Sequence, residues 1–147
     1  MQIFKTSVAR KMAMALSAFF LIIFLVIHLA VNFMSVLSPS IFNMLSHFMG
    51  TNPLIQFAMQ PVLLAGVIFH FVMGFVLELQ NKRARGNEPY YSYNGAANSS
   101  WMSRNMPITG IVILLFLGLH LYDFWVGEMN YKYIEGLPED PNRYYPD

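Results

Sequence analysis

The sequence contains no cysteine, and this absence removes several kinds of metal and redox chemistry. Without thiols the chain forms no disulfide, binds no zinc or iron–sulfur cluster through thiolates, and carries no covalently attached c-type haem. Any metal held by this chain must therefore rest on histidine, methionine or carboxylate ligands.

Charge is also scarce, because charged residues make up only 12% of the 147 residues and the formal net charge is +1. So weakly charged a chain lacks the basic stripe that contacts phosphates, which excludes DNA and RNA as partners. Hydrophobic residues, in contrast, make up 56% of the sequence. This balance is typical of a protein whose main solvent is the lipid bilayer.

Three apolar stretches are long enough to cross roughly 30 Å of hydrocarbon as helices. We predict spans at about 12–34, 55–79 and 106–126. The first is longer than a signal-peptide core and lacks a small-residue cleavage site after it, so we expect it to be retained. The predicted fold is an all-α, polytopic transmembrane helical bundle that forms a single membrane domain over residues 1–147.

Basic residues indicate how these spans are oriented. The loop 35–54 has no lysine or arginine, whereas the N-terminal segment and the loop between the second and third spans hold Lys5, Arg10, Lys11, Lys82, Arg83, Arg85 and Arg104. The positive-inside rule therefore predicts a cytoplasmic N-terminus. In the loop 35–54, an apolar stretch between Pro39 and Gly50 predicts a short helix on the outer surface.

Residues 127–147 are predicted to form an outer loop, because they hold two basic residues against five acidic ones. The segment is polar, rich in proline and tyrosine, and has no terminal cap. We expect it to lead to a further crossing, so that the chain is part of a longer subunit.

Histidine supplies the main functional clue, since three of the four histidines lie one per predicted span: His28, His70 and His120. Ligand-type side chains are costly in hydrocarbon and usually face the interior of a bundle with a partner. Neutral imidazole is a common ligand of haem iron, and a b-type haem needs such ligands and an apolar pocket. We therefore predict haem b, although histidines that only hydrogen-bond between helices are the alternative.

Depth separates the three histidines into two levels. His28 lies 18 residues beyond Arg10 and His120 lies 16 beyond Arg104, which gives rises of roughly 27 and 24 Å from the inner side. His70 lies 12 residues before Lys82, a rise of roughly 18 Å. We predict that His28 and His120 hold the iron of one haem near the outer leaflet, and that His70 serves a second haem nearer the inside.

Residues one helical turn from each histidine fit a tetrapyrrole. Gly66 and Gly74 flank His70 and leave a face that a flat macrocycle can approach. Aromatic and polar side chains flank the other two histidines: Phe24 and Asn32 at His28, and Phe116 and Phe124 at His120. The same glycines would equally permit close packing of two helices.

Several segments, taken in order, resemble a known family. They are Ser7-Val8-Ala9-Arg10-Lys11, the His28 span to Asn32, the His70 helix with Asn81-Lys82-Arg83-Ala84-Arg85, Ser99-Ser100-Trp101-Met102-Ser103-Arg104-Asn105-Met106, and His120-Leu121-Tyr122-Asp123-Phe124-Trp125. Together they resemble the cytochrome b558-type membrane anchor of succinate dehydrogenases and fumarate reductases, over nearly the whole chain.

The resemblance implies five membrane helices and two b haems in a bacterial cytoplasmic membrane. His28 and His120 would hold the outer haem iron, and His70 would share the inner haem iron with a histidine beyond residue 147. Succinate chemistry would occur on a partner flavoprotein. An iron–sulfur subunit would exchange electrons with this anchor, and menaquinone or another quinone would be the substrate.

Two other functions fit part of the same pattern. A cytochrome b subunit of a hydrogenase or formate dehydrogenase also carries histidines on several spans. A small transporter would use them to relay protons or bind an ion without haem. His47, which lies in the loop 35–54, is an ordinary interfacial polar residue or a group at a quinone or proton-transfer site.

Overall fold

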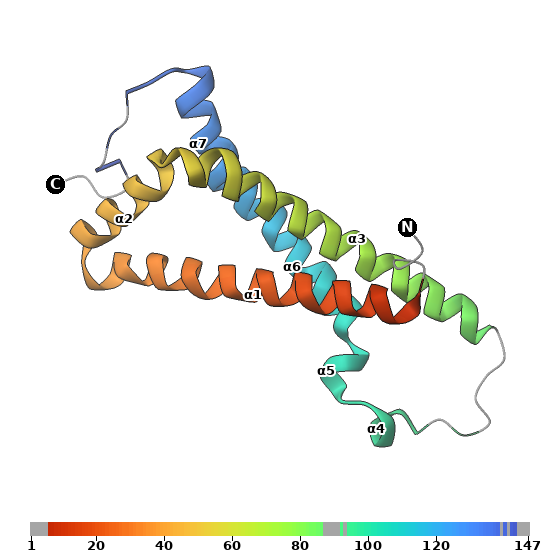
Figure 1. Cartoon of the computed structure of the whole chain (residues 1–147). Helices are drawn as coiled ribbons and strands as arrows, with labels where there is room; N and C mark the ends of the chain where they lie inside the picture. The colour runs from red at the N-terminus through yellow and green to blue at the C-terminus, as the bar shows by residue number, and fades with distance from the viewer. Residues whose placement is uncertain (1–5, 87–91, 93, 139, 141, 144–147) are drawn as a thin grey trace. The chain divides into compact units, whose positions relative to one another are not determined.

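All regular structure in the described part of the chain is helical (Figure 1). The structure is a computed structural model that describes residues 6–86, 92, 94–138, 140 and 142–143. Three helical stretches are long and apolar enough to cross a membrane: Ser7–Leu37, Ile55–Arg85 and Met106–Ile134. The predicted all-α fold with three spans is confirmed, and the chain is a multi-pass membrane protein.

The chain forms two compact units, of which the first comprises Met1–Val72 with Glu139–Asp147 and the second Met73–Pro138. In the first unit, α1 (Ser7–Leu37) begins where the Thr6 hydroxyl accepts the Ala9 N–H at 3.2 Å. A hydroxyl at this position satisfies one of the helix's open N–H groups.

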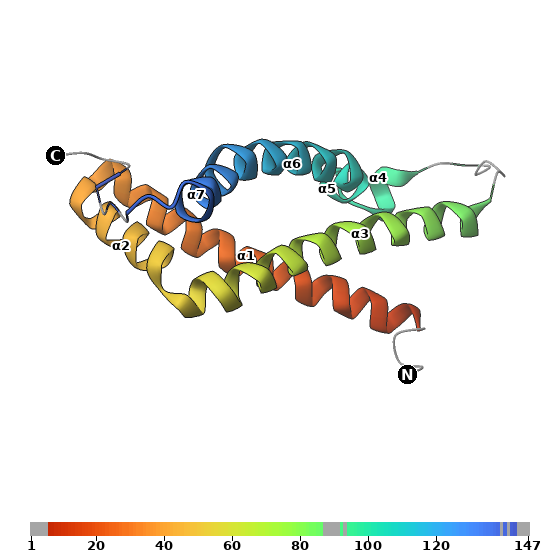
Figure 2. The ribbon, with the colours of Figure 1, turned by 90° about the horizontal axis from the view of Figure 1, so that it is seen from above.

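Ser38 joins α1 to α2 (Pro39–Thr51), the short helix predicted between two breakers. Its N–H donates to the Met34 carbonyl at 2.8 Å, and its hydroxyl accepts the Ile41 N–H at 3.4 Å. Pro39 needs no N–H partner in the first turn. One serine therefore ends α1 and starts α2, and the two helices fold back into contact (Figures 1 and 2).

The second crossing begins with the π-helical segment η2 (Ile55–Met59) and continues into α3 (Gln60–Arg85). The Gln60 N–H donates to the Ile55 carbonyl, five residues back. Pro61 explains the wide turn, because its ring clashes with a carbonyl four residues earlier and it has no N–H to donate. A π turn relieves that clash without ending the helix.

In the second unit, two four-residue helices, α4 (Gly95–Asn98) and α5 (Trp101–Arg104), precede the third crossing. This crossing runs through α6 (Met106–His120), η3 (Leu121–Val126), α7 (Gly127–Met129) and η4 (Asn130–Ile134). It continues past the boundary near 126 expected from the sequence. The helix ends at Ile134, with Glu135 at its C-cap. Gly136 follows with a φ of 61°, which is favourable for glycine, and Pro138 lies two residues further on.

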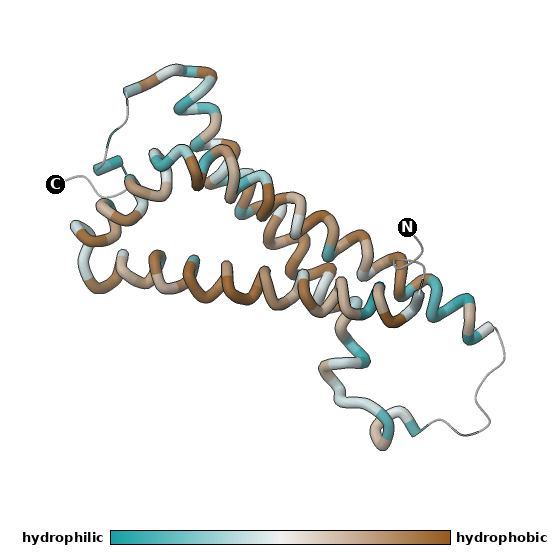
Figure 3. Tube along the Cα trace, viewed as in Figure 1, coloured by the Kyte–Doolittle hydropathy of each residue, from teal (hydrophilic) through white to brown (hydrophobic). Residues whose placement is uncertain are grey.

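The crossing helices bury little within the chain. Among the described residues no hydrophobic side chain is buried, and the 6% exposed Asn43 is the buried polar residue. Figure 3 shows apolar residues around the middle of α1, α3 and α6, with hydrophilic residues toward several ends. Helices that are apolar on all sides are typical of membrane spans, where lipid or further helices cover them.

Candidate functional site

His70 is half-buried on α3 and contacts a serine of another crossing helix. Its Nδ1 lies 2.8 Å from the Ser17 hydroxyl of α1. The same hydroxyl donates to the Met14 carbonyl at 2.9 Å. A hydroxyl has one proton to give; when that proton goes to the Met14 carbonyl, the Ser17 oxygen accepts from His70 and Nδ1 carries the ring proton. This arrangement leaves the lone pair of the neutral imidazole on Nε2.

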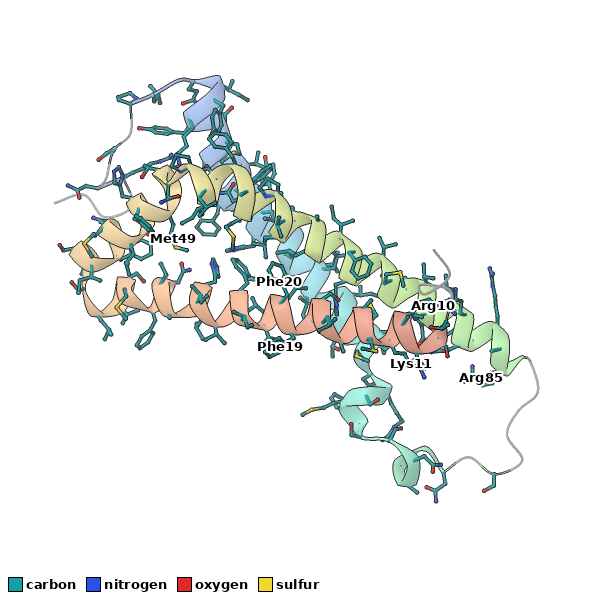
Figure 4. All side chains as sticks on the ribbon, viewed as in Figure 1. Arg10, Lys11, Phe19, Phe20, Met49 and Arg85 are labelled. Atoms are coloured by element: carbon teal, nitrogen blue, oxygen red, sulfur yellow. The ribbon has the colours of Figure 1, made fainter. Side chains whose placement is uncertain are left out.

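The glycine one turn before His70 lies against an aromatic ring. A Cβ added to Gly66 would lie 3.0 Å from Phe20 Cε1 and 3.3 Å from Phe20 Cδ1. In Figure 4, Phe20 points from α1 toward α3, whereas Phe19 points to the opposite side. At Gly66 the structure therefore favours the close-packing interpretation, because Phe20 covers the face expected to lie bare for a macrocycle.

His28, also half-buried, lies on α1 between the residues one turn away on either side. The Phe24 ring stacks on the imidazole with centroids 5.3 Å apart and planes at 24°. The Asn32 amide nitrogen donates to the His28 carbonyl at 2.8 Å and lies 3.5 and 3.4 Å from Nδ1 and Nε2. An atom almost equally far from both nitrogens lies over the ring rather than in line with either lone pair. The imidazole is thus contacted by two side chains of its own helix, one turn to either side.

His120 is the last residue of α6 and has aromatic neighbours one turn to each side. Phe116 stacks at a centroid distance of 5.7 Å with planes at 18°, and Phe124 lies at 4.9 Å with planes at 43°. The wider η3 turn starts at Leu121, directly after the histidine. Such π turns are frequent at functional sites because they change the direction of the following side chains.

The two compact units divide these histidines, with His28 and His70 in the first and His120 in the second. Within the described residues no three His, Cys, Asp or Glu side chains gather to hold a metal ion. A porphyrin provides four equatorial nitrogens itself, so a haem needs only one or two axial side chains from a protein. The pairing of His28 with His120 stays a prediction.

Two polar residues of the first unit make side-chain contacts that the sequence did not predict. Ser17 is one, and it lies on the same face of α1 as Phe24 and His28, at helical spacing. Asn43 of α2 is the other, and its amide donates to the Asn142 Oδ1 at 3.3 Å. His47 lies one turn further along α2, where its carbonyl accepts the Thr51 hydroxyl at 2.8 Å.

The fold and these residues define a multi-pass helical membrane protein with one histidine on each crossing helix. Among curated proteins the chain is similar to the "Succinate dehydrogenase cytochrome b558 subunit" of Bacillus subtilis (strain 168), with 26% identity over 125 residues. This alignment covers 81% of the chain but 58% of the relative, so the chain spans less than two thirds of that protein. No family model matches, and no solved structure matches. The resemblance seen in the sequence is confirmed.

Proposed function

We propose that this chain is the haem-ligating part of a dihaem cytochrome b anchor. The anchor would belong to a succinate:quinone oxidoreductase and carry electrons between its iron–sulfur subunit and menaquinone or another quinone. One observation carries the proposal: each crossing helix holds a histidine, in a chain similar to a succinate dehydrogenase cytochrome b558 subunit over 81% of its length. A partner flavoprotein would perform the succinate chemistry.

The local geometry of the histidines fits axial ligation. Bound haem b supplies one-electron oxidation and reduction of its iron. The chain's part is to present a neutral imidazole in a fixed orientation within an apolar, water-poor setting. Ser17 lies where it can accept the Nδ1 proton of His70, and stacked phenyl rings restrict rotation of His28 and His120. In this proposal His28 and His120 hold the outer haem iron, and His70 holds the inner haem iron.

Charge supports an orientation with the N-terminus in the cytoplasm of a bacterium. The long α3 ends in three basic residues, Lys82, Arg83 and Arg85, and Lys82 also pairs with Glu78 at 3.4 Å. The iron–sulfur subunit would dock on this side, where positive charge also favours retention of the helix end in the cytoplasm. Quinone would exchange electrons on the opposite side, near the outer haem.

Substitution of one outer ligand tests the assignment in the full subunit assembled with its partners. We expect His28→Ala or His120→Ala to remove the outer haem, because only one protein ligand would then be left to hold it. Reduced-minus-oxidised spectra with haem quantitation per polypeptide would then show one haem instead of two. His47→Ala is the matched control and should keep both. Retention of two low-spin haems in either ligand variant would refute the pairing.

A further inference from the structure

Ser17 and His70 come from different crossing helices and meet through their side chains. They are 53 residues apart in the sequence, and their Oγ and Nδ1 atoms lie 2.8 Å apart. Both side chains are half-buried. A serine hydroxyl in an apolar span commonly bonds the carbonyl of its own preceding turn, and Ser17 does so at Met14. The contact with His70 is additional, and the imidazole is its donor when the Ser17 proton goes to the Met14 carbonyl.

We propose that Ser17 is a positioning residue for His70 as an axial ligand of the inner haem. The inference rests on the proposed function of His70. In this proposal the chain of bonds runs from His70 Nδ1–H to Ser17 Oγ, 2.8 Å away, and from Ser17 Oγ–H to the Met14 carbonyl, 2.9 Å away. It holds the ring in the tautomer that offers Nε2 to a metal, and it restrains the ring's rotation about its bond to Cβ.

The hydrogen bond also influences how strongly the imidazole donates electrons. An acceptor on the Nδ1 proton makes the ring a more basic ligand. A more basic ligand stabilises the oxidised iron, so the Ser17 bond lowers the midpoint potential of the haem that His70 ligates. Packing of Phe20 on Gly66, one turn from His70, sets the approach of the two helices at the same level. Helix packing and ligand orientation are therefore fixed together.

The test uses Ser17→Ala and Ser17→Thr in the full subunit within its complex. Alanine removes the acceptor, whereas threonine keeps a hydroxyl that can still bond the preceding turn. Ser35→Ala is the matched control, because the Ser35 hydroxyl donates to the Asn32 carbonyl at 2.7 Å on the same helix. The readouts are redox titration of each haem, the low-spin electron paramagnetic resonance signals, and haem content.

We expect Ser17→Ala to raise the midpoint potential of the inner haem and to shift its resonance signal, with the outer haem unchanged. Ser17→Thr should restore both values, and Ser35→Ala should leave them as they are. An unchanged inner haem in Ser17→Ala, or an equal change in Ser35→Ala, would overturn the proposal. So would loss of the inner haem in both Ser17 variants.

His70→Ala separates this inference from the function on which it rests. If His70 is a ligand, that variant loses the inner haem. If His70→Ala keeps both haems, the assigned ligand itself is wrong. If His70→Ala loses the haem while Ser17→Ala behaves like the parent, only the positioning role of Ser17 is wrong.

Discussion

At the scale of single residues, Gly66 sets how closely two crossing helices approach. Phe20 Cε1 would lie 3.0 Å from a Cβ at this position, closer than carbon atoms normally come. Because Gly66 has no side chain, the Phe20 ring can pack directly against the backbone of α3 at this position. Small residues at helix contacts are the usual means of close approach in membranes, where packing replaces the hydrophobic effect.

We expect Gly66→Ala to destabilise the contact between α1 and α3 by about 1–3 kcal/mol, the usual cost of overpacking. Gly110→Ala is the control, because in the described part of the chain no atom beyond its neighbours and the backbone of its own helix lies within 4 Å of the added Cβ. There the gain in helix propensity should leave stability unchanged or raise it by about 1 kcal/mol. Unfolding in mixed micelles, followed by circular dichroism, measures both.

A second substitution distinguishes a clash from a general effect of alanine. Phe20→Leu replaces the ring with a smaller side chain. Gly66→Ala should therefore lower the free energy of unfolding clearly less in the Phe20→Leu background than in the parent. Equal costs in both backgrounds would show that Phe20 does not oppose the added methyl group.

At the scale of elements, α2 contacts a segment that follows the third crossing. Asn43 is 6% exposed, and its amide donates to the Asn142 Oδ1 at 3.3 Å, across 99 residues of sequence. Both residues lie in the first compact unit. Asn142 is itself oriented locally, since its N–H donates to Asp140 Oδ1 at 2.9 Å. The Asn43–Asn142 pair therefore holds α2 against the segment that contains Asn142.

Asn142→Ala should loosen α2 and leave the crossing helices intact. Loss of one hydrogen bond costs about 0.5–1.5 kcal/mol, which corresponds to roughly a 2- to 13-fold rise in local opening. Hydrogen exchange of the α2 amides is the measurement. Asn98→Ala serves as control, because the Asn98 amide bonds its own turn at the Asn94 carbonyl. Equal protection of α2 in Asn142→Ala and the parent would count against this anchoring.

The sequence predicts long apolar helices well but predicts their ends and partners poorly. Local runs of apolar residues and the breakers between them predict the three spans and the α2 helix. They also predict that His28, His70 and His120 lie on helices. Asn105, at φ −100° and ψ 7°, separates Arg104 from α6. The continuous helix that carries His120 therefore starts at Met106 and rises roughly 21 Å to the histidine, so the roughly 24 Å counted from Arg104 does not lie along one helix. A one-residue break of this kind has no clear signature among polar loop residues.

Contacts between side chains of different helices could not be predicted from the sequence, for a different reason. The bond from Ser17 to His70 and the packing of Phe20 on Gly66 depend on the register between two helices, which no periodicity within one helix specifies. The short helices α4 and α5 do carry cap residues, Asn94 and Ser100, whose side chains accept backbone N–H groups. Four-residue helices are marginal on their own, so such caps alone predict them weakly.

At the scale of the whole molecule, the lack of cysteine makes the membrane topology easy to measure. We expect Ser40→Cys, in the loop 35–54, to react with a membrane-impermeant maleimide in intact cells. Ser103→Cys should react only after the membrane is opened. Both serines are exposed, so their reactivity reports the side of the membrane rather than burial. The reverse labelling pattern would place the N-terminus outside.

The continuous helix from Ile55 to Arg85 has a consequence at its far end. Its 31 residues extend over roughly 46 Å, which exceeds the roughly 30 Å thickness of the hydrocarbon layer. Even when tilted, such a rod projects into the headgroup region and the water beyond it. Lys82, Arg83 and Arg85 therefore lie on a regular helical end that extends beyond the hydrocarbon layer. An acidic protein surface that binds there would contact basic side chains already held on a helix. Binding would then not carry the entropy cost of ordering a loop.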